Sequence, residues 1–485
     1  MRIAFIQNNA LDESQALIDL AGYLQAFGHE CMLFLDREES DLVSSLKTFD
    51  PALSLVACSM LNHWWARAIA TRIRTKINCP IVMAGTGSTL YPSLLEGSDV
   101  DLIIRGEAEK PMAALLDALG HGEPIGDLHS VPGVSRWDGE QWLETPTGSP
   151  LAMTEVPMAN KDLYYKRYPF MREFPFKRFL TSRGCHHRCS YCYISSLNQL
   201  LPSKKDRKVR RKHPEQAVAE VAREKSLGPL SHVHFSDDLF TNDTEWLEHF
   251  APKYRREVGV PFTCNTSAEL INERVAAALA EAGCHAIGFA VETGNAELRK
   301  NVLRKGVHTD HMRKAAQHLR RHGIRLATFN MIALPGETID QAMETVALNA
   351  ELKTDYIRLN YAFPMPGTAM TKYAIEEGYL PKDWAELFGS PGFRYAPGPQ
   401  FSTPFRQEFK NLFLLFRMAA KSTEWTRRCQ KLLSSPTPDP LHKLLSLQGA
   451  WNDKRNFRIP VTAGLKFFAR VGRPELRATN FPALI

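Results

Sequence analysis

The chain has 485 residues, of which 44% are hydrophobic and 23% charged, and its formal net charge is +7. These fractions are typical of a globular protein, and the length predicts about three domains. No segment approaches 18 consecutive apolar residues, and the N-terminal MRIAFIQNN has neither the apolar core nor the cleavage site of a signal peptide, so we expect no membrane span and no leader.

Residues 1–125 predict a doubly wound, Rossmann-like parallel sheet. Short apolar runs at 1–7, 31–36, 53–59, 81–85 and 101–106 alternate with stretches of helical periodicity. Such sheets bind ligands at the carboxyl ends of their strands. The first strand is followed by Asn8-Asn9-Ala10 instead of a dinucleotide fingerprint, so the later Gly85-Thr86-Gly87-Ser88 turn is weak evidence for a nicotinamide cofactor.

A second alternating series follows a segment rich in Pro, Gly and Trp. Residues 126–165 indicate a linker with a hairpin at 134–144, and residues 166–395 indicate a partial (βα)6 barrel. The expected strands of this barrel are 178–183, 232–237, 262–267, 286–292, 324–332 and 356–363. Active sites of such barrels lie at the carboxyl ends of the strands.

The pattern changes after residue 395, and residues 396–485 predict a small helical C-terminal domain. Its main element is a long amphipathic helix at 404–433, and an aromatic, basic segment follows at 461–474. This domain either covers the barrel and shapes its site or is plain packing. The basic run at 204–213 indicates a solvated loop, because no recognised nucleic-acid-binding motif accompanies it.

Three cysteines dominate the chemistry. Cys185, Cys189 and Cys192 lie in TSRGCHHRCSYCY, with spacings of three residues and then two, while the other six cysteines are scattered singly. Three thiolates at this spacing can hold three irons of a [4Fe–4S] cube and leave the fourth iron open to a chelating molecule. The alternatives are a redox cluster and a structural zinc site with His186 or His187 as a further ligand. A labile cluster argues for a reducing cytoplasmic location.

Charged and turn residues end several later strands of the barrel. Asp237 and Asp238 end one strand and are helix-capping residues or ligand-binding carboxylates. Glu292 ends another strand, where a buried carboxylate needs a partner, and Lys305 follows it. Leu334 lies in the ALPGET turn, whose Pro-Gly pair lets backbone approach a flat ring.

These pieces resemble, in order, the radical S-adenosylmethionine (SAM) enzymes that carry an N-terminal cobalamin-binding domain. The likeness covers residues 1–400 and rests on the cysteine loop, HFSDDLFTND, GFAVETGNAELRKNVLRKG, MIALPGET and FPMPGT. It implies a [4Fe–4S] cluster on the three cysteines, SAM on the open iron, a deoxyadenosyl radical and an external electron donor of the flavodoxin or ferredoxin type. The implied SAM contacts are Tyr191, Asp237, Asp238, Glu292, Lys305 and Leu334. The Gly-Gly-Glu turn common in such enzymes is missing.

Residues 84–111 resemble the cobalamin domain of the same enzymes. The resemblance implies corrin contacts from Asn8, Ser59, Met60, Gly85, Thr86, Gly87, Ser88, Gly106 and Glu107. The Asp-x-His-x-x-Gly motif of many cobalamin proteins is replaced by DLHSVPG at 127–133, which is one residue too long, so we expect no histidine from it on cobalt. His63 is a candidate lower axial ligand of cobalt, although we expect its side chain to lie on the surface of a helix.

The expected activity is methylation of an unactivated carbon in a small-molecule or lipid-like substrate. Radical cyclisation, ring contraction or oxidation with the same cofactors is one alternative. A radical methylthiotransferase acting on tRNA and a non-enzymatic cobalamin or iron–sulfur sensor are two others. We expect no nucleic-acid partner, and the aromatic, basic segment at 461–474 leaves peripheral membrane contact open.

Overall fold

The computed structural model describes residues 1–390 and 399–434, and the chain divides into two compact units. The described part of the first unit is Met1–Glu173, Tyr193–Lys212 and a short segment from Ala385. The second unit contains Phe174–Cys192, His213–Trp384 and residues 399–434. The expected tail at 461–474 and most of the expected C-terminal domain lie outside the described residues.

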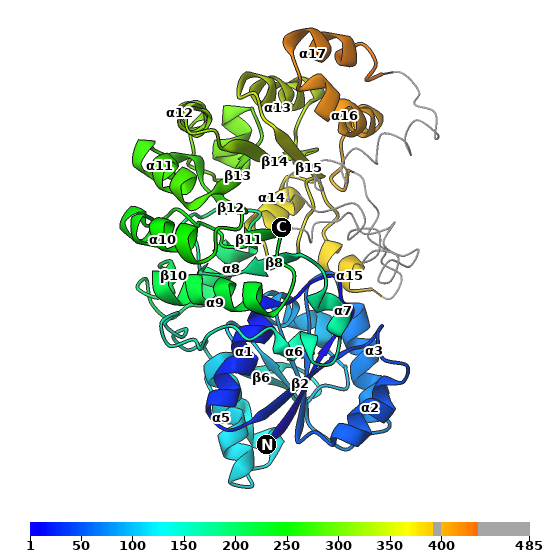
Figure 1. Ribbon diagram of the computed structural model, residues 1–485. Helices are drawn as coiled ribbons and strands as arrows, with labels where there is room; N and C mark the ends of the chain where they lie inside the picture. The colour runs from blue at the N-terminus through cyan, green and yellow to red at the C-terminus, as the bar shows by residue number, and fades with distance from the viewer. Residues whose placement is uncertain (391–398, 435–485) are drawn as a thin grey trace. The chain divides into compact units, whose positions relative to one another are not determined.

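A seven-stranded sheet forms the centre of the first unit (Figure 1). Its order is β2-β1-β3-β4-β5-β6-β7, with parallel pairing through β5 and antiparallel pairing of the last two strands. The strands are β1 Arg2–Gln7, β2 Glu30–Leu35, β3 Leu53–Ala57, β4 Ile81–Ala84, β5 Leu102–Ile104, β6 Val134–Trp137 and β7 Trp142–Glu144. The predicted parallel sheet is therefore confirmed, and the hairpin expected at 134–144 extends it.

Helices cover the sheet of the first unit. They are α1 Gln15–Ala26, α2 Leu42–Phe49, α3 His63–Arg74, α4 Thr86–Leu90, α5 Glu109–Gly120, α6 Asp162–Tyr165, α7 Pro169–Arg172, α8 Tyr193–Leu200 and α15 Trp384–Gly389. Short polar side chains cap the first turn of several of these helices. The Ser14 side chain accepts from the N–H of Leu17 at the start of α1, and the Asp41 side chain accepts from the N–H groups of Val43 and Ser44 at the start of α2. Apolar side chains from α2 and α3 pack on the strands in one buried cluster.

A six-stranded parallel sheet forms the second unit, in the order β15-β14-β13-β12-β11-β8. The strands are β8 Phe176–Phe179, β11 His232–Phe235, β12 Phe262–Thr266, β13 Cys284–Glu292, β14 Arg325–Ile332 and β15 Tyr356–Tyr361. Sequential order and parallel pairing make this sheet the predicted partial barrel. The helices α9 Pro214–Leu227, α10 Thr244–Glu257, α11 Glu273–Ala282, α12 Thr309–Arg321 and α13 Ile339–Glu351 follow one another along its outer side (Figure 1).

Aromatic packing holds the strands of the second unit to their helices. Phe235 contacts Phe240, Phe250 and Phe262, with ring centroids 4.8, 5.6 and 5.3 Å apart. All four side chains are fully buried. Burying such rings contributes about 1.5–3 kcal/mol each, so this cluster stabilises the packing of the helices on the outer face of the sheet.

Two expectations about elements differ from the structure. The segment expected as one strand at 178–183 is β8 followed by the short β9 Ser182–Arg183, because Thr181 turns its N–H and hydroxyl to the Asp237 carboxylate. The long helix expected at 404–433 is two helices, α16 Arg406–Ala419 and α17 Thr423–Gln430. Ser422 causes this break, because its side chain caps α17 by accepting from the N–H of Trp425.

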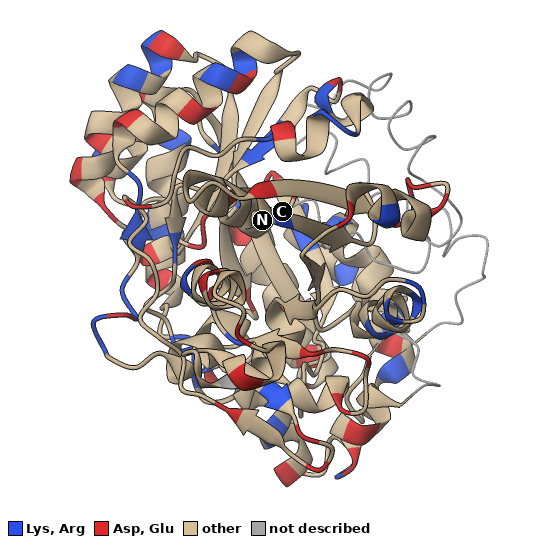
Figure 2. Ribbon diagram, turned by 90° about the horizontal axis from the view of Figure 1, so that it is seen from below, with Lys and Arg blue, Asp and Glu red and all other residues tan. Residues whose placement is uncertain are grey.

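The described helices carry both signs of charge. Figure 2 shows basic and acidic segments mixed over the helices, and surface pairs such as Arg274 with Glu248 and Arg313 with Glu351 neutralise one another. None of the helices within the described residues is long and apolar enough to cross a bilayer.

We predict that Gly85→Ala destabilises the first unit. Gly85 has φ 133° and ψ −169°, a conformation that is essentially restricted to glycine, and a Cβ there would lie 2.3 Å from the carbonyl oxygen of Cys58. Strain and displacement together should lower the free energy of unfolding by about 2–5 kcal/mol in a urea titration of the full chain.

The matched control is Gly28→Ala. Gly28 also has positive φ, 81°, but a Cβ there would meet nothing within 4 Å, so its cost should be about 1 kcal/mol. Equal effects of the two substitutions would contradict the close approach at Gly85.

Candidate active site

The three cysteines lie in a loop that begins after β9 at Gly184, whose φ is 101°. Ser190 anchors this loop at its centre. Its N–H donates to the carbonyl of Leu303 at 2.9 Å, its hydroxyl donates to the carbonyl of Val302 at 2.6 Å, and its own carbonyl accepts from the N–H of Met370 at 2.9 Å. Segments that follow two different strands of the sheet therefore hold the cysteine loop in place.

The surroundings of the thiols favour a bound metal group. Burial raises the pKa of Cys185 to about 12, with smaller contributions from Asp238 and the other two thiols. Burial also raises the pKa of Cys189, and the nearby ammonium of Lys305 offsets part of this effect. Thiols with raised pKa values stay protonated at neutral pH, so metal must supply the free energy that makes them thiolates.

The spacing of the sulfurs also bears on the choice of metal group. Thiolates that share one zinc ion lie about 3.8 Å apart, as follows from a Zn–S length of about 2.3 Å. Within the described residues, the three cysteine sulfurs do not form a set of donors that all lie within 4.8 Å of one another. Their arrangement is therefore not that of three thiolates on a single zinc ion.

Tyr191, Glu292 and Lys305 lie together beside Cys189. The Tyr191 hydroxyl donates to Glu292 Oε1 at 2.7 Å, and both Glu292 and Lys305 are 7% exposed. Burial raises the pKa of Glu292, while Lys305 and the Tyr191 hydroxyl oppose that rise. The structure therefore brings three of the predicted SAM contacts into one polar cluster at the cysteine loop.

The two predicted aspartates have different surroundings. Asp237 is fully buried and accepts hydrogen bonds from the N–H of Thr181 at 3.0 Å, from the Thr181 hydroxyl at 2.6 Å and from the Ser182 hydroxyl. This carboxylate joins the end of β11 to the start of the cysteine loop. Asp238 is exposed and lies close enough to Cys185 for its charge to act on the thiol.

Leu334 lies in a strained turn after β14. Its N–H donates to Glu337 Oε2 at 3.1 Å, and the preceding Ala333 has φ 60°. Burial raises the pKa of Glu337 to about 8, so this carboxyl group is mostly protonated at neutral pH. The turn adjoins the end of β13, because Glu292 pairs with Asn330 in the sheet.

Strand ends of the first unit come together around Gly85 and Gly87. A Cβ on Gly87 would lie 2.8 Å from Cys58 Sγ and 2.9 Å from the carbonyl of Ser59, so both glycines allow adjacent loops to touch. Ser88 donates to the carbonyl of Ile104 at 3.0 Å. These contacts join the carboxyl ends of β3, β4 and β5, which is where a doubly wound sheet binds ligands.

The remaining predicted corrin contacts surround the same strand ends. Asn8 follows β1 and its side chain accepts from Arg37, Met60 is buried, and Thr86 begins α4. Gly106 has φ 90° and its N–H donates to the Thr89 hydroxyl at 3.1 Å. The Glu107 carboxylate forms an ion pair with Arg210. Asn8, Met60, Thr86, Gly106 and Glu107 remain predicted cobalamin contacts.

The expected surface position of His63 is wrong. Its side chain is 2% exposed, its ring stacks on Phe388 with centroids 5.3 Å apart, and Nδ1 lies 2.8 Å from the carbonyl of Met60. A carbonyl can only accept, so Nδ1 carries the proton and Nε2 carries the lone pair. Burial lowers the pKa of His63, so the ring is neutral.

Sequence reasoning missed several residues that position the site. They are Thr181, Ser182, Ser190, Glu337 and Thr89. Each acts through a contact with a segment that is distant in sequence or through a turn. For Glu337 alone the sequence carried a signal, because a carboxylate within the apolar ALPGET turn needs a partner when it is buried.

The comparisons with known proteins agree with this architecture. Residues 179–348 match the family model of the Radical SAM superfamily. An uncharacterized methyltransferase of Pyrococcus horikoshii is 26% identical over 348 residues, which cover 70% of this chain and 73% of the relative. The cytidylyl-2-hydroxyethylphosphonate methyltransferase of Streptomyces wedmorensis is 21% identical over 395 residues, covering 73% of this chain and 72% of the relative.

A solved structure shares the fold. The radical SAM methyltransferase TsrM of Kitasatospora setae, solved with cobalamin and a [4Fe–4S] cluster, superposes with a TM-score of 0.65 at 18% identity, over 84% of this chain and 78% of TsrM. At that identity the likeness establishes the fold alone. The family match covers the cysteine loop and most of the half-barrel, and it leads to one assignment: residues 179–348 form a Radical SAM domain.

Proposed function

We propose that this chain is a cobalamin-dependent radical SAM methyltransferase that methylates an unactivated carbon of a small-molecule or lipid-like substrate. The observation that carries the proposal is the anchored loop of Cys185, Cys189 and Cys192 beside the Tyr191–Glu292–Lys305 cluster. The doubly wound unit of the same chain supports the cobalamin part. The two relatives named as methyltransferases support the reaction type.

The half-barrel residues fit a cluster and SAM. Cys185, Cys189 and Cys192 would hold the cluster, and Glu292 would accept hydrogen bonds from the ammonium or ribose hydroxyls of SAM. Lys305 lies beside Glu292 and would attract the carboxylate of SAM. When bound, the cluster, SAM and cobalamin supply the hydrogen abstraction and the methyl group that protein side chains cannot supply.

The chain's own part is to position these groups and exclude water. Asp237 fixes the start of the cysteine loop through Thr181 and Ser182, and Glu337 fixes the turn at Leu334. Asp237, Leu334 and Glu337 are all at most 2% exposed. The hydrogen bonds of these buried groups hold their geometry without reorganisation, which is what orientation catalysis requires.

The first unit fits a flat cofactor at the carboxyl ends of its strands. The absence of side chains at Gly85 and Gly87 lets the loop after β3 lie against this turn, and Ser88 joins the turn to the end of β5. Ser59, Gly85, Thr86, Gly87, Ser88 and Gly106 would approach the corrin. His63 has a neutral ring with a lone pair on Nε2, which is the form that a metal ligand needs.

The main test is product formation by the protein reconstituted anaerobically with iron, sulfide and hydroxocobalamin. With a strong reductant and SAM we expect one corrinoid retained per chain after gel filtration, and both 5′-deoxyadenosine and S-adenosylhomocysteine among the products. When the assay contains trideuteromethyl SAM, mass spectrometry of the product should show that the substrate has gained a labelled methyl group. Cytidylyl-2-hydroxyethylphosphonate is the first substrate to try. Release of deoxyadenosine without corrinoid retention or S-adenosylhomocysteine would contradict methyl transfer.

We predict that replacing Cys185, Cys189 and Cys192 together by alanine abolishes cluster assembly. The variant should lose its iron and sulfide, and deoxyadenosine release should fall to the level of a protein-free blank, because the cluster is held by three thiolates. Cys31→Ala is the control, since Cys31 lies on β2 in the other unit and should leave the iron content unchanged. A triple variant that keeps its cluster would overturn the assignment of the ligands.

We predict that Glu292→Gln weakens SAM binding by about 10–150-fold, which corresponds to the 1.5–3 kcal/mol of a hydrogen bond to a charged group. Equilibrium dialysis of radiolabelled SAM against the reconstituted protein measures this change. Glu297→Gln is the matched control, because Glu297 is exposed and follows the same strand. Equal affinities of the two variants would remove Glu292 from the SAM site.

A further inference from the structure

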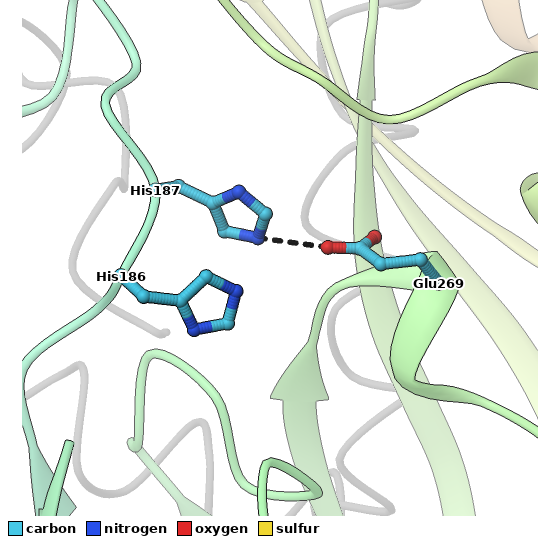
Figure 3. A group of neighbouring side chains, drawn as sticks. All are labelled: His186, His187 and Glu269. Carbon is cyan, nitrogen blue, oxygen red and sulfur yellow. Dashed lines mark ion pairs between the residues drawn. The ribbon is translucent and has the colours of Figure 1, made fainter. Parts of the chain in front are cut away.

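His186, His187 and Glu269 come together from two parts of the second unit (Figure 3). The histidines belong to the cysteine loop, and Glu269 lies in the short helix η3 Ala268–Leu270 after β12. Each of the three side chains offers one donor atom, and these atoms all lie within 4.8 Å of one another. Within the described residues this is the one group of three such donors, and the cluster ligands take no part in it.

His187 and Glu269 form a close ion pair. His187 Nε2 and Glu269 Oε1 are 2.9 Å apart, and both atoms are shielded from solvent. Yet within the described residues neither atom has a hydrogen-bond partner of acceptable geometry. Two donors on one ion at about 2.0–2.2 Å lie about 3.3–3.6 Å apart in a tetrahedral site and about 2.8–3.1 Å apart in an octahedral one, so the observed spacing is that of neighbouring octahedral ligands.

The same unit contains an ordinary contact of this kind for comparison. Glu273 accepts from His318 Nδ1 at 2.8 Å through one oxygen and from His322 Nε2 at 2.7 Å through the other. Both contacts have the geometry of hydrogen bonds, and the three residues do not form a group of converging donors. Glu273 therefore differs from Glu269 in two ways: its histidine contacts have hydrogen-bond geometry, and its donor atoms do not converge on one point.

The histidine rings are also arranged for a shared ligand. His186 and His187 are adjacent in the chain, yet their ring centroids lie only 4.4 Å apart at 40°, so both imidazoles are on the side of Glu269 (Figure 3). Asn242 is within hydrogen-bonding reach of the His186 side chain. Partners of this kind orient metal-binding imidazoles in known sites.

We propose that His186, His187 and Glu269 bind one divalent transition-metal ion, separate from the three-cysteine cluster. Two imidazoles and one carboxylate suit zinc or iron(II), and three protein ligands leave a coordination position for water or a substrate oxygen. His186 is exposed, so ions and water can reach the site. The ion ties the first half of the cysteine loop to the end of β12, as Ser190 ties its second half to Val302 and Leu303.

The test uses the holoenzyme after the cluster is assembled, so that the cysteines are occupied. The probe is Zn²⁺ in anaerobic equilibrium dialysis at micromolar free zinc, read by elemental analysis. We expect one zinc per chain beyond the cluster iron. Glu269→Gln and the double variant His186→Ala/His187→Ala should bind zinc at least about 100-fold more weakly, beyond the 10–100-fold cost of losing an outer partner.

Three further variants make the result decisive. Glu281→Gln and His249→Ala are exposed controls that should keep the zinc. His318→Ala/His322→Ala removes the other histidine pair and should also keep it. X-ray absorption at the zinc edge should show nitrogen and oxygen ligands without sulfur.

The proposal is overturned if the holoenzyme binds no zinc, if the Glu269→Gln variant binds zinc as tightly as the unchanged chain, or if the His318→Ala/His322→Ala variant loses its zinc. Iron and sulfide content of every variant shows whether the cysteine loop is intact. Zinc binding requires neither cobalamin nor turnover, so failure of this proposal and failure of methyl transfer are seen in separate measurements.

Discussion

The site depends on holding an irregular loop with three thiols at the carboxyl edge of a parallel sheet. The loop has no strand or helix of its own across the cysteines, so its backbone groups need partners elsewhere. Ser190 supplies them through Val302, Leu303 and Met370. Asp237 fixes the entrance of the loop in the same way. Backbone and carboxylate hydrogen bonds thus place the sulfurs before any metal binds.

Burial sets the protonation states around that loop. Cys185, Cys189, Glu292 and Glu337 all have raised pKa values because they are removed from water. A charged group in such surroundings costs several kcal/mol unless it has a partner. Lys305 and Tyr191 partner Glu292, and bound iron would partner the thiols. Without metal the thiols stay protonated and uncharged, so metal binding must supply the free energy of their deprotonation.

The sequence predicted the helices, the strands and the candidate site residues, because each of these depends on a local pattern of residue types. Apolar runs at a regular interval located every strand of the half-barrel to within a few residues, and the cysteine spacing predicted a metal-binding loop after the first of them. The contacts that position those residues could not be predicted. Thr181 and Asp237 are 56 residues apart in the sequence, and Ser190 and Val302 are 112 residues apart. No local sequence pattern in one of these segments indicates its partner in the other.

His63 shows the same limit in the first unit. An isolated histidine at the start of a helix indicates a surface position, yet Phe388, more than three hundred residues later, covers the ring. The break between α16 and α17 was in principle visible, because Lys-Ser-Thr at 421–423 contains a capping serine. Amphipathic periodicity continues through that break, and periodicity alone therefore predicted one helix where capping chemistry produces two.

Two strained residues connect the fold to the chemistry. Glu292 and Ala333 end adjacent strands with φ of 61° and 60°, a region that costs about 1–2 kcal/mol for residues other than glycine. At an ordinary strand end each side chain would continue the alternation of the sheet. The left-handed residue instead turns the chain, which brings Glu292 to the Tyr191 hydroxyl and Leu334 N–H to Glu337. These two hydrogen bonds offset the strain, so the conformation persists without a ligand and would hold the Glu292 carboxylate in position for the proposed contact with SAM.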